Sequence, residues 1–225
     1  MIPTKLSQLM TDKGNEEHYE KNKIYHAQNF EHRLFKLEKG YVKRYQVTNN
    51  EDRVIELIYG PGHIFPLSQL YKEIFGIEQN QKNFIYVYQA MTDIDAYALS
   101  TKVVMNEIEH DPLLYIDLYY ESGLRLKSNI DRLASNSFRD NYKKVAHQIV
   151  MLANDFGVES NIGGHPHTKI LVPLEAIDIA EQINISTNDA DSILDNLNKR
   201  GLITYKNNHI FVKDMDLLQD VYLAG

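Results

Sequence analysis

Residues 111–136 read DPLLYIDLYYESGLRLKSNIDRLASN, and the interpretation of the whole chain starts from them. Asp111 can cap a helix, and Pro112 suits a first helical turn, where a missing N–H leaves nothing unpaired. Apolar residues then recur in alternating steps of three and four, which is typical of a seam between two paired helices. The seam consists of Ile116, Tyr119, Gly123, Leu126, Ile130 and Leu133. We therefore predict a dimerisation helix; the alternative is a helix buried against its own domain.

The sequences before and after this helix differ in the periodicity of their apolar residues. Short strand-like segments precede it, and helical periodicity follows it. We therefore expect an α+β protein with a β-rich domain at residues 1–110, the dimerisation helix at 111–136, and a helical domain at 137–225.

Composition limits the possible functions of the chain. Its 225 residues, 43% apolar and 24% charged, suit an ordinary globular protein of two modest domains. The absence of cysteine excludes disulfides, thiolate metal sites and a cysteine nucleophile. A net charge of −7 argues against non-specific nucleic-acid binding by the chain as a whole. No run is apolar enough for a membrane span or a signal peptide, so we expect a cytoplasmic protein without a membrane partner.

The first domain has the pattern of a β-roll, that is, a double-stranded jelly roll. Short segments rich in aromatic and β-branched residues are separated by Gly, Pro, Asn and Asp turns. The expected strands are 34–37, 41–47, 54–59, 84–91 and 94–99. An amphipathic helix is expected at 67–75, and a short helix followed by a mobile connection at 1–23.

The last domain has the pattern of a winged helix–turn–helix. Ser137 is expected to cap a helix that Gly157 ends, followed by a loop at 161–167 and a strand at 169–172. Helices at 174–183 and 187–200 are separated by the Asn184-Ile185-Ser186 turn. Strands at 202–206 and 209–212 then flank Asn207-Asn208, which accepts the positive φ of a tight hairpin.

This order of elements resembles the Crp/Fnr family of bacterial transcription regulators from Ile24 to Val212. In the β-roll the resemblance is carried by LFKLEKGYVK (34–43) and by IYGPGHIF (58–65), which is similar to the family's Gly-Pro-Gly-Asp-x-Phe corner. In the last domain it is carried by Ile179-Ala180, by Ile185-Ser186 and by LNKRGLI (197–203). The resemblance implies a homodimer that binds double-stranded DNA at a pseudo-palindromic operator, with RNA polymerase as a further candidate partner.

The β-roll departs from the cyclic-nucleotide binders of this fold. Their ribose-holding Gly-Glu is replaced here by Pro66-Leu67, and their phosphate-holding Arg-Ser or Arg-Thr by Phe84-Ile85. A buried phosphate without a cation is poorly compensated, so we do not expect cyclic AMP to bind. Two alternatives stay open: a filled roll without a ligand, or an unidentified small apolar effector bound near Phe65, Leu67, Tyr71, Phe84 and Tyr86.

The reading helix departs from the family as well. Thr187, Asn188 and Ser192 stand where the family usually presents Arg and Glu, and an Asn can pair with adenine. Asp189 and Asp191 oppose phosphate binding. The full predicted DNA-binding set is Lys169, Ser186, Thr187, Asn188, Ser192, Lys199, Arg200, Lys206 and His209, and each cation in it could equally be a solvated surface charge.

Other chemistry is weakly supported. His165-Pro166-His167 lacks further ligands at a diagnostic spacing, so we expect neither a metal nor another cofactor. No nucleophile elbow or phosphate loop occurs, and we do not expect an enzyme. The sequence thus favours a homodimeric, sequence-specific DNA-binding regulator. The rival interpretation is a ligand-sensing or protein-interaction dimer that has lost DNA binding.

Overall fold

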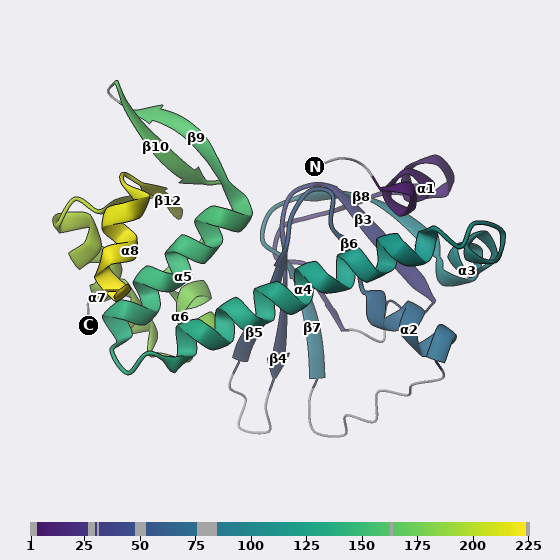
Figure 1. The fold of residues 1–225 in the computed structure, drawn as a ribbon, viewed down its shortest axis with the longest axis horizontal. Helices are drawn as coiled ribbons and strands as arrows, with labels where there is room; N and C mark the ends of the chain where they lie inside the picture. Colours follow the sequence, from purple (N-terminus) through teal and green to yellow (C-terminus); the bar gives the residue numbers. More distant parts are fainter. Residues whose placement is uncertain are drawn as a thin grey trace. The chain divides into compact units, whose positions relative to one another are not determined.

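The computed structural model describes residues 4–26, 30, 32–47, 53–75, 85–162 and 164–223. Two compact units divide the chain, at residues 1–128 and 129–225, and the division falls within one long helix, α4 (Leu114–Ser137). The α+β fold class, with an N-terminal β-roll, a long central helix and a C-terminal winged helix–turn–helix, is confirmed (Figure 1).

The first unit contains two antiparallel four-stranded sheets with the orders β1-β8-β3-β6 and β2-β7-β4-β5. Their strands are β1 (Asn15–Tyr19), β2 (Ile24–His26), β3 (Arg33–Lys39), β4 (Val42–Val47), β5 (Arg53–Tyr59), β6 (Ile64–Phe65), β7 (Ile85–Ala90) and β8 (Ile94–Ser100). The mobile connection expected before residue 24 is wrong in part. Residues 15–19 form β1, because their backbone pairs with β8 over five residues.

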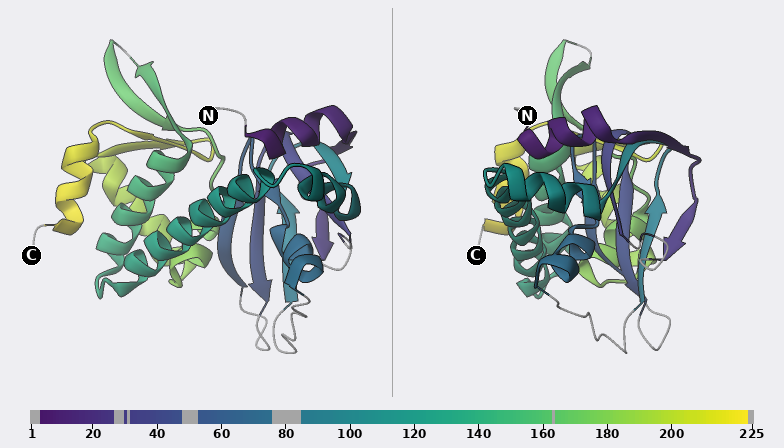
Figure 2. Two further views of the ribbon diagram at one scale, coloured as in Figure 1. Left: turned by 45° about the vertical axis from the view of Figure 1, so that its right-hand side comes forward. Right: turned by 90° about the vertical axis from the view of Figure 1, so that its right-hand side faces the viewer.

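The helices of this unit gather on one side of it (Figure 2). They are α1 (Lys5–Lys13), α2 (Leu67–Phe75), α3 (Thr101–His110) and the beginning of α4. Side chains alternate across a strand, so β3 turns Leu34 toward these helices and Phe35 and Leu37 toward the interior of the roll. The helical side buries Leu6, Met10, Leu70, Val104, Ile108, Leu114 and Leu118 around Leu34.

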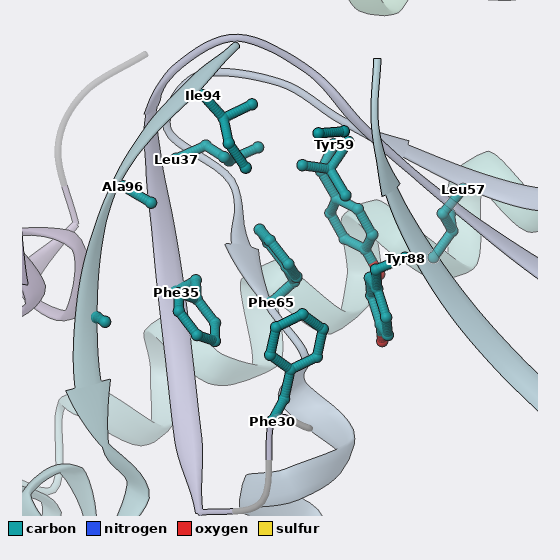
Figure 3. Close-up of a cluster of buried hydrophobic side chains, with 12 residues drawn as sticks. Phe30, Phe35, Leu37, Leu57, Tyr59, Phe65, Tyr88, Ile94 and Ala96 are labelled. Atoms are coloured by element: carbon teal, nitrogen blue, oxygen red, sulfur yellow. The ribbon is translucent and has the colours of Figure 1, made fainter. Parts of the chain in front are cut away.

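Aromatic rings fill the interior of the roll. Figure 3 shows Phe30, Phe35 and Phe65 close together, with Tyr59 and Tyr88 beside one another. The rings of Phe30 and Phe35 lie 5.0 Å apart, and those of Tyr59 and Phe65 lie 4.9 Å apart. Edge-to-face and offset pairs at these distances add to the stabilisation that burial provides.

The second unit consists of α5 (Asn141–Phe156), β9 (Gly157–Ile162), β10 (His165–Ile170), α6 (Ala176–Ile183), α7 (Thr187–Lys199), β11 (Ile203–Lys206), β12 (His209–Val212) and α8 (Met215–Leu223). Its sheet has the order β11-β12-β10-β9. The hairpin turn at Asn207 and Asn208 is confirmed, with φ of 53° and 61°.

Two local expectations for this unit are wrong, and one helix was not predicted. Asp140, not Ser137, caps α5 by accepting a hydrogen bond from the Tyr142 N–H. The loop expected at 161–167 belongs instead to a paired hairpin of β9 and β10, which projects from the unit (Figure 1). Helix α8 had not been expected, and it packs along α5.

Candidate nucleic-acid interface

The helix–turn–helix is specified by its caps and its buried face. Glu175 and Asp178 form a reciprocal capping box at the start of α6. Asn184 ends α6 with φ 53°, a left-handed conformation that Asn tolerates well. The two helices bury Ile179, Ala180, Ile183, Ala190, Leu194 and Leu197. The remaining face of α7 is therefore left for solvent or a ligand.

The predicted reading residues lie at the start of α7. Thr187, Asn188 and Ser192 are exposed. Ser186 has a structural task, because its hydroxyl accepts a hydrogen bond from the Asp189 N–H at 3.0 Å and so caps the helix. The structure thus brings these four predicted residues together at one helix terminus.

Acidic residues share the exposed surface of α7. Asp189, Asp191 and Asp195 are all exposed on this helix, whose last turn holds Lys199. Asp189 accepts a hydrogen bond from Asn141 of α5 at 3.5 Å, which keeps its carboxylate beside the start of α7. These carboxylates would repel the phosphate backbone of a bound nucleic acid.

Arg200 is held by a neighbouring helix. Its Nη1 donates to the Tyr142 hydroxyl at 2.7 Å, and its guanidinium lies 5.5 Å from the centre of the Tyr142 ring. It remains exposed, so it can still present other N–H groups to a phosphate. Lys143 and Lys144 lie in the first turn of α5.

The other predicted cations lie on a sheet. Lys169 pairs with Phe211 in the register of β10 and β12, and Lys206 pairs with His209 in that of β11 and β12. Residues opposite each other point to the same face, so Lys169, Lys206 and His209 share one face of the sheet. The Lys169 ammonium lies 5.7 Å from the Phe211 ring centre.

The same register assigns further residues to this outer sheet face, which we define as Val158, Ser160, His167, Lys169, Thr204, Lys206, His209 and Phe211. It carries two lysines and two histidines but no carboxylate. Sequence reasoning missed His167, because the hairpin that aligns it with Lys169 had been expected to be a loop. The predicted DNA-binding set therefore separates into a helix group on α7 and a sheet group.

The predicted dimer seam lies on an exposed face of α4. Ile116 is 62% exposed, Tyr119 82%, Leu126 62%, Ile130 55% and Leu133 61%. A Cβ added to Gly123 would meet nothing within 4 Å. Large apolar side chains in a row along one helix form an exposed patch of the kind that marks an interaction site. We call this row the outer face of α4.

The opposite face of α4 packs on the first unit, and we call it the inner face. Leu114 and Leu118 are buried against α1, α2 and α3. Asp117 accepts a hydrogen bond from the Leu6 N–H at 2.8 Å. Burial raises the pKa of the Glu121 carboxyl, and the guanidinium of Arg125 lies over the Tyr59 ring at 5.5 Å. The inner face thus joins the helix to the roll through both apolar and charged residues.

The predicted effector residues do not line one cavity. Phe65 points into the roll, whereas Leu67 and Tyr71 pack in the helical cluster on the other face of the sheet. Tyr86 contacts Arg44 and Gln46, and Phe84 lies outside the described residues. The observed cavity of about 10 Å³ is lined by aromatic and aliphatic side chains, among them Tyr25, Phe30, Phe65 and Tyr88. Such a volume barely holds one water molecule.

Neither a metal-ligating cluster nor a membrane-spanning helix occurs in the part of the chain that the structure describes. The described residues contain no cluster of three or more His, Asp or Glu side chains that could hold a metal ion. Within the same ranges, none of the helices has the length and apolar character that a membrane span requires.

Comparison with known proteins agrees with this geometry. Residues 143–221 match the sequence model of the Crp-like helix-turn-helix domain. No relative was found among curated proteins. The match supports a DNA-binding transcription regulator, and it covers the unit that contains α6 and α7.

Solved structures with the same fold cover nearly the whole chain. FixK2 from Bradyrhizobium japonicum is 14% identical with a TM-score of 0.72, over 92% of this chain and 96% of that one. A CooA mutant from Carboxydothermus hydrogenoformans is 19% identical with a TM-score of 0.70, over 97% and 92%. A CRP/FNR-family transcriptional regulator from Thermus thermophilus is 15% identical with a TM-score of 0.66, over 93% and 98%. Identities this low show the fold alone.

Proposed function

The chain has the Crp/Fnr fold and its residues 143–221 form a Crp-like helix-turn-helix domain, and from this premise we propose that it is a homodimeric, sequence-specific DNA-binding transcription regulator. The observation that carries the proposal is the exposed start of α7 within that domain. The exposed residues there are Thr187, Asn188 and Ser192. They lie at the N-terminal end of α7, and in this motif it is the N-terminal end of the second helix that contacts the bases.

A second copy of the chain is the partner that suits the outer face of α4. Its apolar residues repeat in steps of three and four, which is the spacing that two supercoiled helices bury between them. A two-fold dimer places its two reading helices about 34 Å apart, in successive major grooves. The operator would then be a pseudo-palindrome.

The acidic surface of α7 shapes how the dimer would bind. Asn188 can bond the N6 and N7 atoms of adenine, and the Thr187 methyl can contact thymine. Phosphate contacts then come from Lys199 and Arg200 at the end of α7 and from Lys169, Lys206 and His209 on the outer sheet face. We expect modest affinity, because few cations oppose several carboxylates, and a salt slope set by the number of these cations that contact phosphates.

Cyclic AMP is not the effector that this roll would bind. The residue pairs that hold ribose and phosphate in cyclic-nucleotide binders are replaced, and Pro66-Leu67 stands in one of these places. The aromatic rings also leave a cavity of only about 10 Å³. These observations support a roll filled by its own side chains. RNA polymerase remains a candidate partner of the DNA-bound protein.

The test is selection of bound duplexes from a random DNA pool at low and moderate salt, followed by two variants on the selected site. Asn188→Ala should relax the base preference at one position of each half-site by about 1–3 kcal/mol. Lys206→Gln should weaken binding to all sequences alike and reduce the salt slope by about one. Glu159→Gln, a charge change on the neighbouring hairpin outside the predicted set, serves as the control.

A non-DNA-binding dimer is the second candidate, and the three carboxylates on α7 favour it. Recovery of no motif at either salt would support it and would contradict the proposal. If both Asn188→Ala and Lys206→Gln left operator binding unchanged, α7 and the outer sheet face would be the wrong surfaces.

A further inference from the structure

A row of hydrogen-bonded polar side chains crosses the core of the second unit. Ser135 of α4 is fully buried, and Gln148 of α5 and Gln182 of α6 are each 5% exposed. The Ser135 hydroxyl donates to Oε1 of Gln148 at 3.2 Å, and Nε2 of Gln148 donates to Oε1 of Gln182 at 2.6 Å. Nε2 of Gln182 donates to the Asp178 carbonyl at 3.0 Å. We call these four residues the polar chain, which connects the end of α4 to the first helix of the helix–turn–helix.

The direction of the polar chain is fixed at its α6 end. A backbone carbonyl only accepts, so Gln182 must turn its amide nitrogen toward Asp178 and its oxygen toward Gln148. Gln148 must then donate to that oxygen and turn its own oxygen toward Ser135. The Ser135 hydroxyl has a single proton, and the polar chain is complete only when Gln148 accepts it. Hydrogen bonds that run in one direction polarise and strengthen one another.

His147 competes for the same proton. Its Nδ1 lies 2.7 Å from the Ser135 oxygen. Without a hydrogen, Nδ1 can only accept, and it then takes the proton that Gln148 needs. With a hydrogen, Nδ1 donates to Ser135, and the hydroxyl proton is released to Gln148. The Asp131 carbonyl, at 3.2 Å, is a third acceptor for this hydroxyl, but it is present in both states and does not distinguish them.

Aromatic rings hold the His147 imidazole in place. Its centre lies 5.4 Å from that of the Phe138 ring and 4.7 Å from that of the Tyr222 ring in α8. Burial lowers the pKa of His147 below its usual range, and the Asp131 carboxylate on α4 opposes this effect. Burial also raises the pKa of the Tyr222 hydroxyl, so Tyr222 stays neutral near and below pH 7. Of the groups around this ring, His147 itself is therefore the one that gains a proton there.

We propose that His147 is a proton-dependent positioning residue of the helix–turn–helix. A hydrogen on Nδ1 completes the polar chain and so holds α6 to the end of α4, whereas a bare Nδ1 withdraws the Ser135 proton and loosens that connection. The imidazolium always has this hydrogen, but a neutral imidazole carries its one N–H on either nitrogen. The connection between α4 and α6 therefore tightens as His147 becomes protonated.

The polar chain does not depend on the proposed function, whereas its effect on DNA binding rests on it. Helix α6 leads into α7 through the turn at 184–186. If α7 reads bases, the two states of the polar chain differ in how firmly they hold the reading helix, and a differential hold is what can shift a conformational equilibrium. Operator affinity should then depend on the charge of His147.

The first experiment uses the full chain without DNA, so that its failure is separate from a failure of DNA binding. Histidine NMR gives the pH midpoint of the His147 ring, whose signal is identified by its loss in His147→Gln. Urea denaturation is then measured for the parent, Ser135→Ala, Gln182→Met and the double variant, above and below that midpoint. Non-additivity between Ser135 and Gln182 reports the connection through Gln148, and groups that titrate alike in all four chains cancel.

The coupling should be strongest below the midpoint. There, Ser135→Ala should raise the unfolding constant about tenfold in the parent but only about twofold in the Gln182→Met chain, because the second change has already broken the polar chain. Above the midpoint the two effects should agree within about twofold. In a His147→Gln background the coupling should no longer depend on pH. His165→Gln, at an exposed position of the hairpin, is the control and should keep the pH dependence of the parent.

A second measurement does not require Ser135→Ala to fold. Coupling is reciprocal, so a complete polar chain must favour the protonated form of His147. Gln182→Met should therefore lower the NMR midpoint of His147 by about half a pH unit, although the changed residue is separated from the imidazole by Gln148 and Ser135. A role confined to packing would leave that midpoint unchanged.

The DNA arm compares operator affinity above and below the midpoint. The change with pH should differ by about threefold or more between the parent and His147→Gln, whereas His165→Gln should follow the parent. Additive effects at both pH values, coupling that is equal above and below the midpoint, or a His147 that stays neutral until the chain unfolds would each overturn the proposal. Intact coupling with the same pH dependence of operator affinity in His147→Gln would show that the polar chain does not position α7. If no operator can be selected, the proposed function fails while the cycle still decides the polar chain.

Discussion

The two faces of α4 have similar apolar content but different surroundings. On the inner face Leu114 and Leu118 are 4% and 3% exposed. On the outer face Tyr119 and Leu126 are 82% and 62% exposed. Burial of a Leu side chain contributes roughly 1.5–3 kcal/mol. The side chains of the inner face already contribute this free energy to folding, whereas those of the outer face can still contribute it by association. One side of the helix therefore serves folding, and we propose that the other serves association.

Negative charge introduced on the outer face should have the largest effect on dimerisation and on operator binding. Leu126→Asp combined with Ile130→Asp would place two carboxylates in the seam of each copy, where like charges meet in a low-dielectric interface. We expect the dimer dissociation constant and the operator dissociation constant to rise by at least about 100-fold. Sedimentation and DNA titration measure the two quantities.

Leu217→Asp on α8 is the control for that experiment, because Leu217 is 54% exposed but lies outside the seam. It should leave both constants within about threefold of the parent. A chain that is already monomeric, or a double variant that still dimerises, would show that the outer face of α4 is not the interface.

A truncation on the inner face should act on folding instead. Leu118→Ala leaves a cavity among α1, α2 and α3, and we expect the free energy of unfolding of the first unit to fall by about 2–5 kcal/mol. Urea denaturation at a concentration where the chain is monomeric measures it. Leu126→Ala under the same conditions should change the stability by less than about 0.5 kcal/mol. Equal losses would remove the distinction between the faces.

The outer face was predictable from the sequence, and the inner face was not. A seam with steps of three and four is visible in the chain itself, as are the Asn207-Asn208 turn and the aromatic strands. The inner face contains Glu121 and Arg125, and charged residues ordinarily indicate solvent. Their burial depends on contacts with Tyr59 and Ile64, which lie some sixty residues earlier in the chain. The local sequence pattern around Glu121 and Arg125 therefore cannot predict it.

The missed strands have the same physical cause. Residues 15–19, NEEHY, have little β character, and they form a strand because β8 offers its edge. The hairpin of β9 and β10 contains Gly, Asn, Pro and His, a composition typical of loops, yet it pairs over six residues. In both cases the partner strand overrides the local preference.

Acid should weaken the part of the roll that lies beside Arg125 of the inner face. Burial, together with Arg125, lowers the pKa of His63 to about 4 from an ordinary value near 6.5. Between these values the unfolded chain binds a proton that the folded chain does not, so stability is complete above pH 6.5 and falls as pH falls toward 4. We expect His63 to account for a loss of about 3 kcal/mol over that interval.

The measurement is the free energy of unfolding from pH 7 to pH 4, with His63→Gln compared to the parent chain. The variant should lose less stability than the parent over this interval. His165→Gln, at an exposed position of the hairpin, is the control and should follow the parent curve. Parallel curves for His63→Gln and the parent would show that this histidine is not the group that titrates.

The smallest and sharpest test concerns Gly123, where the two roles of α4 oppose each other. Replacement of a helical Gly by Ala stabilises a helix by up to about 1 kcal/mol, and the added Cβ meets nothing within 4 Å in a single chain. Gly123→Ala should therefore stabilise the monomer slightly, as urea denaturation at low concentration would show. If two backbones approach closely at this position, the same methyl group weakens the dimer, and the dissociation constant measured by sedimentation should rise several-fold. If Gly123→Ala instead lowers the dimer dissociation constant while it stabilises the monomer, Gly123 lies away from the contact. The seam would then be centred on Leu126, Ile130 and Leu133.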